Sequence, residues 1–418
     1  MATQPIQTID GTTLRAKAAR VFSFPACLQS SPAAALLGLL AFACPATAQN
    51  ASPPPQPYAA INREAINYSG PDREPRRDLP GQEIKIGILV PLEGARKAEG
   101  LAILQAAQLA VDDESASPLP EGRRLVLVAR DETGLWGRAP SELVRMVVDD
   151  NAVALVTSTN GSAAHLAEQV GNRLGVPVIT LATDSTTTQI NIPWFFRLAP
   201  DDAEQARVFA EDLYRRRGFE RIALVTERDH DGRVGGEEFE KAAQRLQMPA
   251  PTRVEVDLAR GDWDQVSAKI AESQPQAVIL WIGPEAAARL LEHSESHLSG
   301  TPVYACRKAL SEPFLSLAAQ DTGGSIWLVA PSGERSTARR EFSQRYRTRT
   351  GYAPSPAAAE AYDAVRLIAA GVRRAGPNRA RLRDELVKVS AFSGASGIIS
   401  FDGAGNNQAD VALVKLGE

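Results

Sequence analysis

Two short polar segments hold the residues best suited to contact a small molecule. Residues 157–162 (Thr-Ser-Thr-Asn-Gly-Ser) lie between an apolar run and a helical pattern. Free backbone amides at a helix N-terminus attract anions such as carboxylates, which makes Asn160, Gly161 and Ser162 candidate ligand-binding residues. Alternatively, Asn160 or Ser162 only caps the helix. The second segment, residues 180–185 (Thr-Leu-Ala-Thr-Asp-Ser), follows the next apolar run and is either a second ligand loop or a polar turn.

Motifs for catalysis or for a metal are missing from the sequence. It has no G-x-S-x-G motif, no P-loop and no dinucleotide-binding glycine pattern. His293 and His297 are four residues apart on a predicted helix, but neither the glutamate of an HExxH motif nor a third ligand accompanies them. We therefore expect a protein that binds a small molecule without a metal or other cofactor, and that is not an enzyme.

Short Val-, Ile- and Leu-rich runs alternate with helical patterns along the chain, as in a parallel sheet that helices cover on both faces. The sequence predicts strands at 84–90, 124–129, 153–157, 176–180, 194–198, 221–226, 253–256 and 277–282. It predicts helices at 101–113, 141–149, 162–173, 203–217, 236–246, 263–273 and 285–294. The two series meet near Pro200, which predicts two doubly wound α/β lobes with a ligand cleft at the carboxyl ends of the strands.

The N-terminal region has the features of an export signal. Basic residues precede an apolar stretch at 33–43, and Ala-Thr-Ala at 46–48 is typical of a cleavage site, which makes Gln49 the predicted first residue of a periplasmic protein. Cys44 offers an alternative as a lipoprotein anchor, which we disfavour because the expected leucine is missing three residues before it. Residues 49–82 are rich in proline, which predicts a linker that is not part of any hydrophobic core. No run is long enough to span a membrane.

Composition excludes two classes of partner and one kind of crosslink. The chain of 418 residues has a net charge of −4, to which the first 48 residues contribute +2, so the mature part carries about −6. This charge does not suit nucleic acid or an anionic membrane surface. Cys306 is the one cysteine beyond the signal, so no intramolecular disulfide is expected.

Several segments, in this order, resemble the type I periplasmic solute-binding proteins of ABC importers, of the branched-chain amino acid (Leu/Ile/Val-binding) kind. They are 86–92 (IGILVPL), 107–113 (AQLAVDD), 126–132 (VLVARDE), 175–180 (GVPVIT), 196–200 (FRLAP), 222–226 (IALVT), 361–365 (AYDAV) and 392–403 (FSGASGIISFDG). The resemblance implies three crossovers and a hinge between the lobes, with 83–200 plus 332–390 in one lobe and 201–331 plus 391–418 in the other.

The same resemblance implies a function. A binding protein of this kind captures a small polar, amino acid-like or carboxylate-bearing molecule and delivers it to the permease subunits of an ABC importer. The alternative is a ligand-sensing receptor or envelope regulator built on the same fold. Neighbouring genes for permeases and ATPases would distinguish the two.

The resemblance also implies site residues. Ala182 and Thr183 match the loop that contacts a ligand carboxylate. Tyr362 matches a tyrosine near the cleft; alternatively, it is a tyrosine of the core. Three positions depart from amino-acid binders: Glu93 replaces a small polar residue, Asp231 an aromatic one, and Arg307 the acidic residue that pairs with a ligand ammonium. Since Arg307 would favour an anion, either the ligand is not a simple α-amino acid or Asp231 binds its cation. In the alternative interpretation Arg307 points to solvent.

Overall fold

The first of two parallel sheets is built from the N-terminal part of the chain. The computed structural model describes residues 68–134, 137–190, 192–294, 300–320, 325–331 and 336–416. In the first sheet the strand order is β2-β1-β3-β4-β5, and all neighbours are parallel. The strands are β1 (Glu83–Val90), β2 (Arg124–Asp131), β3 (Ala154–Thr157), β4 (Val178–Thr180) and β5 (Phe195–Arg197).

The second sheet repeats this order and adds one antiparallel edge strand. Its order is β13-β10-β9-β8-β6-β7, and only β10 and β13 pair antiparallel. The strands are β6 (Ile222–Glu227), β7 (Thr252–Val256), β8 (Ala277–Trp281), β9 (Val303–Ala305), β10 (Ile326–Pro331) and β13 (Val411–Lys415). The predicted doubly wound α/β fold is therefore confirmed.

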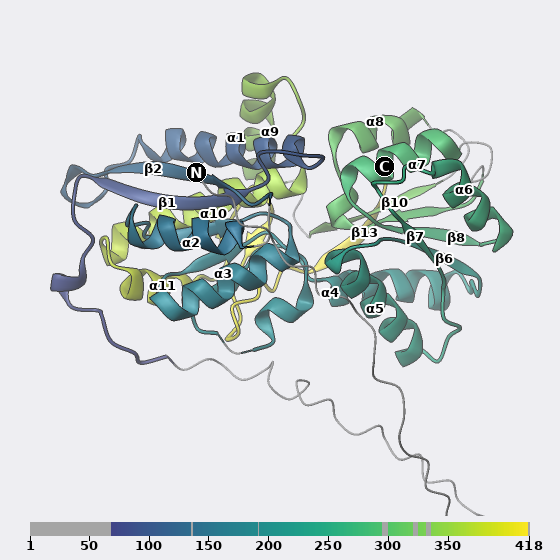
Figure 1. Cartoon of the computed structure of the whole chain (residues 1–418), viewed down its shortest axis with the longest axis horizontal. Coiled ribbons are helices and arrows are strands. Elements are labelled where there is room, and N and C mark those ends of the chain that lie inside the picture. The colour runs from purple at the N-terminus through teal and green to yellow at the C-terminus, as the bar shows by residue number, and fades with distance from the viewer. Residues whose placement is uncertain are drawn as a thin grey trace, which may run out of the picture. The chain divides into compact units, whose positions relative to one another are not determined.

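Helices cover both sheets (Figure 1). Around the first sheet lie α1 (Lys97–Glu114), α2 (Arg138–Val148), α3 (Gly161–Leu174), α9 (Thr337–Thr350), α10 (Pro356–Ala375) and α11 (Arg379–Val387). With the second sheet are α4 (Asp202–Ala210), continued by a π-helical segment (Glu211–Arg216), α5 (His230–Arg245), α6 (Trp263–Glu272), α7 (Pro284–Ser294) and α8 (Glu312–Gln320). We call the two sheets with their helices the first and second lobes; all described residues belong to one compact unit.

Each lobe has its own apolar core. Ile86, Ile88 and Val90 of β1 pack with α1 and α10 on one face of the first sheet, and Leu89 packs with α2 and α3 on the other. In the second lobe a single cluster surrounds Phe209, Phe239 and Tyr304. This double coverage explains why the strands read as continuous apolar runs rather than alternating ones.

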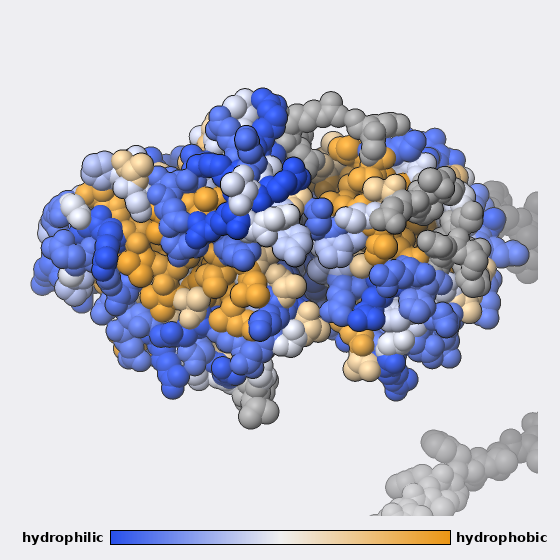
Figure 2. All heavy atoms as spheres, turned by 90° about the horizontal axis from the view of Figure 1, so that it is seen from above, coloured by the Kyte–Doolittle hydropathy of each residue, from blue (hydrophilic) through white to orange (hydrophobic). Residues whose placement is uncertain are grey.

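Most large apolar side chains of the described residues are buried, and few are exposed. On the face in Figure 2, hydrophilic residues interrupt the hydrophobic areas. The exposed large hydrophobic residues of the described chain are spread over several elements, and two of them, Val144 and Val148, lie four residues apart on α2; the others are Leu101, Ile190, Leu258, Tyr352, Ile398 and Val414.

Helix α5 begins at His230, six residues before the predicted start at Gly236. Its glycines discouraged a helix prediction, but they allow close packing: a Cβ on Gly232 would lie 2.2 Å from the carbonyl oxygen of Glu227, and one on Gly235 would lie 1.8 Å from Trp281 Nε1. Asp229 caps the helix by accepting a hydrogen bond from the Gly232 amide at 2.7 Å. The earlier start places His230 and Asp231 in the first turn.

The segment that follows α11 does not lie in the lobe that the sequence predicted for it. The hairpin of β11 (Phe392–Ser393) and β12 (Ile398–Ile399) belongs to the first lobe, where Ala395 and Ile399 join the core. The buried Asp363 of α10 accepts hydrogen bonds from the amides of Ala395 and Ser396 at 2.8 and 2.7 Å. The proposed lobe boundary at 391 is thus too early for this hairpin, although β13 does lie in the second sheet.

The described end of the predicted linker is anchored to the first lobe. Arg73 pairs with Asp384 of α11 at 2.6 Å, and Asp78 pairs with Arg381 at 2.7 Å. The expectation of a spacer without contacts is therefore wrong for residues 68–82, because α11 neutralises their charges. The predicted signal peptide (1–48), Cys44 and the rest of the linker lie outside the described residues.

Candidate functional site

Loops from both lobes meet at the carboxyl ends of the central strands. In each sheet the strand order reverses direction next to its first strand, between β1 and β3 and between β6 and β8. Ligands of open α/β sheets bind at such switch points. Here Arg96 lies in the loop after β1 and Gly161 begins α3 after β3, while Asp231 lies in the first turn of α5 after β6 and Lys308 in a 3-10 turn after β9.

On the first lobe, Arg96 organises a buried ionic network. Its Nε lies 3.0 Å from Glu99 Oε2 and its Nη1 lies 3.1 Å from Glu132 Oε1. Burial would lower the pKa of Arg96, but these two carboxylates raise it above the usual range. Burial raises the pKa of Glu132 to about 7, although Arg96 and a 2.5 Å hydrogen bond from Ser158 oppose the shift. Glu132 can therefore change protonation near neutral pH.

On the second lobe, Lys308 occupies the corresponding central place. Its Nζ lies 2.9 Å from Asp231 Oδ2 and 3.7 Å from carboxylate oxygens of both Glu227 and Asp229. Burial would lower the pKa of Lys308, but these three carboxylates raise it above its usual range. Each lobe thus presents one cation surrounded by an excess of carboxylates.

The two lobes contact each other through Asp231 and the N-terminus of α3. The Gly161 amide donates to Asp231 Oδ1 at 2.9 Å. Asn160 caps α3 by accepting from the Ala163 amide at 3.2 Å, so the predicted cap is confirmed. A Cβ on Gly161 would lie 2.6 Å from Asp231 Oδ1, so only glycine permits this approach. The anion expected at this helix N-terminus is, in this structure, a carboxylate of the protein itself.

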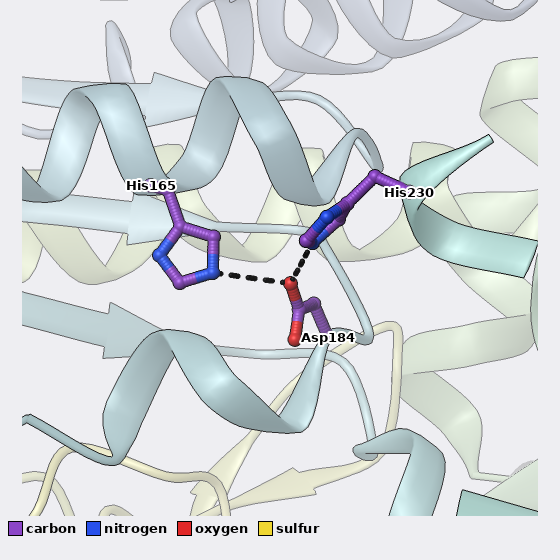
Figure 3. A group of neighbouring side chains, drawn as sticks. All are labelled: His165, Asp184 and His230. Atoms are coloured by element: carbon purple, nitrogen blue, oxygen red, sulfur yellow. Dashed lines mark hydrogen bonds and ion pairs between the residues drawn. The ribbon is translucent and has the colours of Figure 1, made fainter. Parts of the chain in front are cut away.

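A second contact between the lobes joins His165 and Asp184 of the first lobe to His230 of the second (Figure 3). Asp184 Oδ2 lies 2.7 Å from His230 Nε2 and 3.2 Å from His165 Nε2. Hydrogen bonds to Asp184 and to Glu168 raise the pKa of His165 to about 9, although burial opposes them. Burial would raise the pKa of Asp184, but its bonds to both imidazoles lower it below the usual range.

Four of the predicted site residues are either exposed or have their backbone groups hydrogen-bonded within the protein. Glu93 and Ser162 are exposed. The amide of the buried Ala182 donates to Thr180 Oγ1 at 3.1 Å, and the carbonyl of Thr183 accepts from the Asp202 amide at 2.8 Å. The loop at 180–185 is therefore held by internal hydrogen bonds.

Arg307 lies between the lobes, but its charge has a partner within the protein. Its side chain is 5% exposed, so the interpretation that it points to solvent is wrong. Its Nε donates to Glu360 Oε1 of α10 at 2.7 Å. Because Glu360 neutralises it, the argument that Arg307 needs an acidic ligand group loses its basis.

Tyr362 lies away from the contact between the lobes. Its hydroxyl donates to Asp113 of α1 at 2.7 Å and accepts from Arg345 of α9 at 2.7 Å, while its ring packs on Phe342. The structure therefore places Tyr362 in the core of the first lobe.

A cavity of about 400 Å³ opens beside the Arg96 loop. None of the predicted site residues lines it. Its walls are Ala95, Leu258, Gly261, Trp263, Glu285, Arg289 and His293. Of the histidine pair considered as a metal site, His293 lies here, 3.1 Å from Asp264, and His297 lies outside the described residues.

Sequence reasoning missed most of the charged residues between the lobes. Arg96, Glu132 and Lys308 each follow a strand by one to six residues, and Glu227 is the last residue of β6. The rule that ligands lie at carboxyl ends of strands could have found them. Glu360 had no such signal, because it lies within helix α10 rather than after a strand.

Comparisons with known proteins agree with this architecture. The sequence pattern of the periplasmic binding protein family matches residues 83–417. A Leu/Ile/Val-binding protein homologue of Brucella melitensis is 22% identical over 300 residues, which cover 70% of this chain and 80% of the relative.

Solved structures show the same fold at low sequence identity. A branched-chain amino acid transporter substrate-binding protein of Streptococcus pneumoniae, in complex with isoleucine, is 22% identical, with a TM-score of 0.69 over 80% of this chain and 99% of that one. An ABC transporter solute-binding protein of R. palustris, in complex with benzoate, is 20% identical, with a TM-score of 0.72 over 80% and 93%. With the match to nearly all of the described chain, these findings show that the protein belongs to the periplasmic binding protein family.

Proposed function

We propose that this protein captures a small carboxylate-bearing molecule between its lobes and delivers it to the permease subunits of an ABC importer. Members of its family are binding proteins rather than enzymes, and the family implies a location outside the cytoplasm. None of the described helices has the length and hydrophobicity that a bilayer span requires. The similar proteins include one in complex with isoleucine and one with benzoate, both of which carry a carboxylate.

The observation that carries the proposal is the hydrogen bond from the Gly161 amide to Asp231. A helix N-terminus at a switch point is an anion-binding position, and here a carboxylate from the opposite lobe fills it. When the lobes separate, Asp231 leaves with the second lobe and the amide can receive a ligand carboxylate instead.

A ligand screen with one matched pair of variants tests this function. Thermal-shift assays would compare leucine, isoleucine, valine, glutamate and benzoate, and calorimetry would measure the affinity of each hit. Asp231→Asn removes the competing charge, so carboxylate ligands should bind more tightly, by roughly threefold to tenfold. Asp264→Asn, at a side chain that is 88% exposed, is the control and should leave affinity unchanged. Weaker carboxylate binding by Asp231→Asn would instead mean that Asp231 binds a ligand cation.

Closure of the lobes around the ligand is part of the proposal. Ligand contacts from both lobes exist only when the lobes meet, so ligand shifts the population toward the closed form. Periplasmic binding proteins are a standard example of hinge closure around a ligand, and small-angle scattering should show a smaller radius of gyration at saturating ligand. An unchanged profile would contradict the mechanism.

Export through the N-terminal segment completes the proposal. We infer that residues 1–48 direct secretion and are removed, so that the periplasmic protein begins at Gln49. N-terminal sequencing of the protein from the periplasmic fraction tests this. An intact Met1 or an acylated Cys44 would overturn it.

A further inference from the structure

His165, Asp184 and His230 form a compact group of metal-binding side chains across the two lobes (Figure 3). His165 comes from α3, Asp184 precedes the 3-10 turn Ser185–Thr188, and His230 is the first residue of α5. One ligand atom from each side chain lies within 4.8 Å of the other two. The three residues belong to elements that come together only in the folded protein.

The geometry is close to that of a zinc site. Zinc bound at about 2.0–2.1 Å in a tetrahedron keeps its ligand atoms roughly 3.3 Å apart. The His165–Asp184 and His230–Asp184 separations are 3.2 and 2.7 Å. The ligand atoms of the two histidines lie within 4.8 Å of each other, so small rotations of the partly exposed imidazole rings would bring all three groups to bonding distance. Two imidazoles and one carboxylate leave the fourth position open, as in catalytic or ligand-accepting zinc sites.

A buried carboxylate already orients one imidazole for metal binding. His165 Nδ1 lies 3.1 Å from Glu168 Oε2, so that its Nε2 faces Asp184 Oδ2 at 3.2 Å and Thr186 Oγ1 at 2.9 Å. Metal-binding histidines commonly donate their other ring N–H to a carboxylate in this way. Glu168 is 1% exposed, and its Oε1 has no hydrogen-bond partner among the described atoms. On His230, Nδ1 lies 3.3 Å from the side chain of the exposed Arg233, which is free to turn toward solvent.

The carboxyl groups of Asp184, Asp231 and Asp202 lie close together around this group. The carboxylates of Asp184 and Asp231 both approach Gly161, within 2.9 and 2.6 Å of where its Cβ would lie. Asp202, also nearby, is fully buried, and burial together with Asp184 and Asp231 raises its pKa. Its Oδ1 has no hydrogen-bond partner among the described atoms. A divalent cation at His165 and His230 would reduce this repulsion.

We propose that His165, Asp184 and His230 bind a zinc ion that links the two lobes. Since two ligands lie on the first lobe and the third on the second, zinc binds the closed arrangement more tightly than the open one and shifts the protein toward it. This departs from the sequence-based expectation that the protein has no metal site. Metal binding itself does not depend on the proposed transport function. Only an effect of zinc on the release of a transported ligand would depend on that function.

Zinc binding to the mature protein, without a histidine tag, tests the proposal. The chain has four histidines, which makes a complete set of controls practical. Calorimetry with ZnCl₂ alone should give one site per chain, and CoCl₂ alone should give the absorption spectrum of a tetrahedral nitrogen and oxygen site. His165→Gln and His230→Gln should each weaken zinc binding by at least tenfold. His293→Gln is the matched control, because His293 also lies beside an aspartate but outside the site, and it should bind zinc like the unaltered protein.

The outcomes distinguish this site from zinc binding elsewhere on the chain. Circular dichroism would first establish that the two glutamine variants are folded, and both substitutions lie at partly exposed residues. Zinc should raise the melting temperature of the unaltered protein and of His293→Gln, but not that of His230→Gln. Binding that survives both His165→Gln and His230→Gln, or that is lost in His293→Gln, would overturn the proposal. Failure of the ligand screen proposed for the transport function would leave this result untouched.

Discussion

The buried pair of Arg307 and Glu360 gives the strongest prediction about stability. Their side chains are 5% and 3% exposed, and Arg307 Nε lies 2.7 Å from Glu360 Oε1. Arg307 lies in the 3-10 turn Arg307–Ala309 of the second lobe, whereas Glu360 is in α10 of the first. Replacing Arg307 by methionine keeps much of the volume but leaves a carboxylate unpaired between the lobes.

The size of the effect follows from burial and distance. Two unit charges about 4 Å apart attract by about 4 kcal/mol at an effective dielectric constant near 20. Removing one partner of a buried pair typically costs about 3–5 kcal/mol, while replacing both by apolar residues is often neutral. We therefore expect Arg307→Met to lose about 3–5 kcal/mol, and the double variant with Glu360→Leu to recover most of it. Burial raises the pKa of Glu360, so the measurement belongs at about pH 8, where protonation offsets less of the loss.

Urea unfolding of the four proteins of this double-mutant cycle measures the coupling directly. Far-ultraviolet circular dichroism and tryptophan fluorescence should give coincident transitions if the lobes unfold together. Arg289→Met is the control, because Arg289 and Glu285 form an exposed pair on α7 and should contribute less than about 1 kcal/mol. A loss for Arg307→Met no larger than for Arg289→Met, with no recovery in the double variant, would refute the reasoning.

Three further predictions concern single side chains. Tyr362→Phe removes hydrogen bonds to Asp113 and Arg345, so it should lower the free energy of unfolding in a denaturant titration by about 1 kcal/mol. It should leave ligand affinity unchanged, and a tenfold loss of affinity would show that Tyr362 contacts the ligand. Cys306 is buried, and burial raises the pKa of its thiol to about 12, so the folded mature protein should react with a thiol reagent only as fast as it opens. The raised pKa of Glu132, about 7, means that the native state holds a proton that the unfolded state has released between about pH 4.5 and 7. Stability should therefore fall as pH rises through this window, by on the order of 1–3 kcal/mol more than in Glu132→Gln, and equal pH slopes in the two proteins would contradict this.

The sequence was sufficient for the fold and the class of protein. Short apolar runs such as 84–90 are recognisable because both faces of the strand are covered, and the predicted runs matched strands β1 to β8, whereas β9, β10 and β13 were not among them. The motifs at 361–365 and 392–403 have a physical basis that their spacing alone did not reveal. Asp363 holds the amides of Ala395 and Ser396, and a Cβ on Gly394 would lie 2.4 Å from its Oδ2.

Local pattern was less reliable where packing overrides propensity. The glycines at 232, 235 and 236 led to a helix start that was six residues late, because glycine is unfavourable in helices unless close packing requires it. Arg307 was a candidate for the cleft, but its partner Glu360 lies 53 residues away, and no sequence signal connects the two.

The composition of the contact between the lobes was decided only by the tertiary structure. Gly161 was a candidate from its place at a helix N-terminus, and Asp231 from its departure from related binders, but nothing in the sequence indicated that they bond to each other. His165, Asp184 and His230 likewise come from three elements in two lobes. Periodicity reports which face of one element is buried, whereas a site between lobes depends on where several loops end in space, and that is determined by the packing of both sheets.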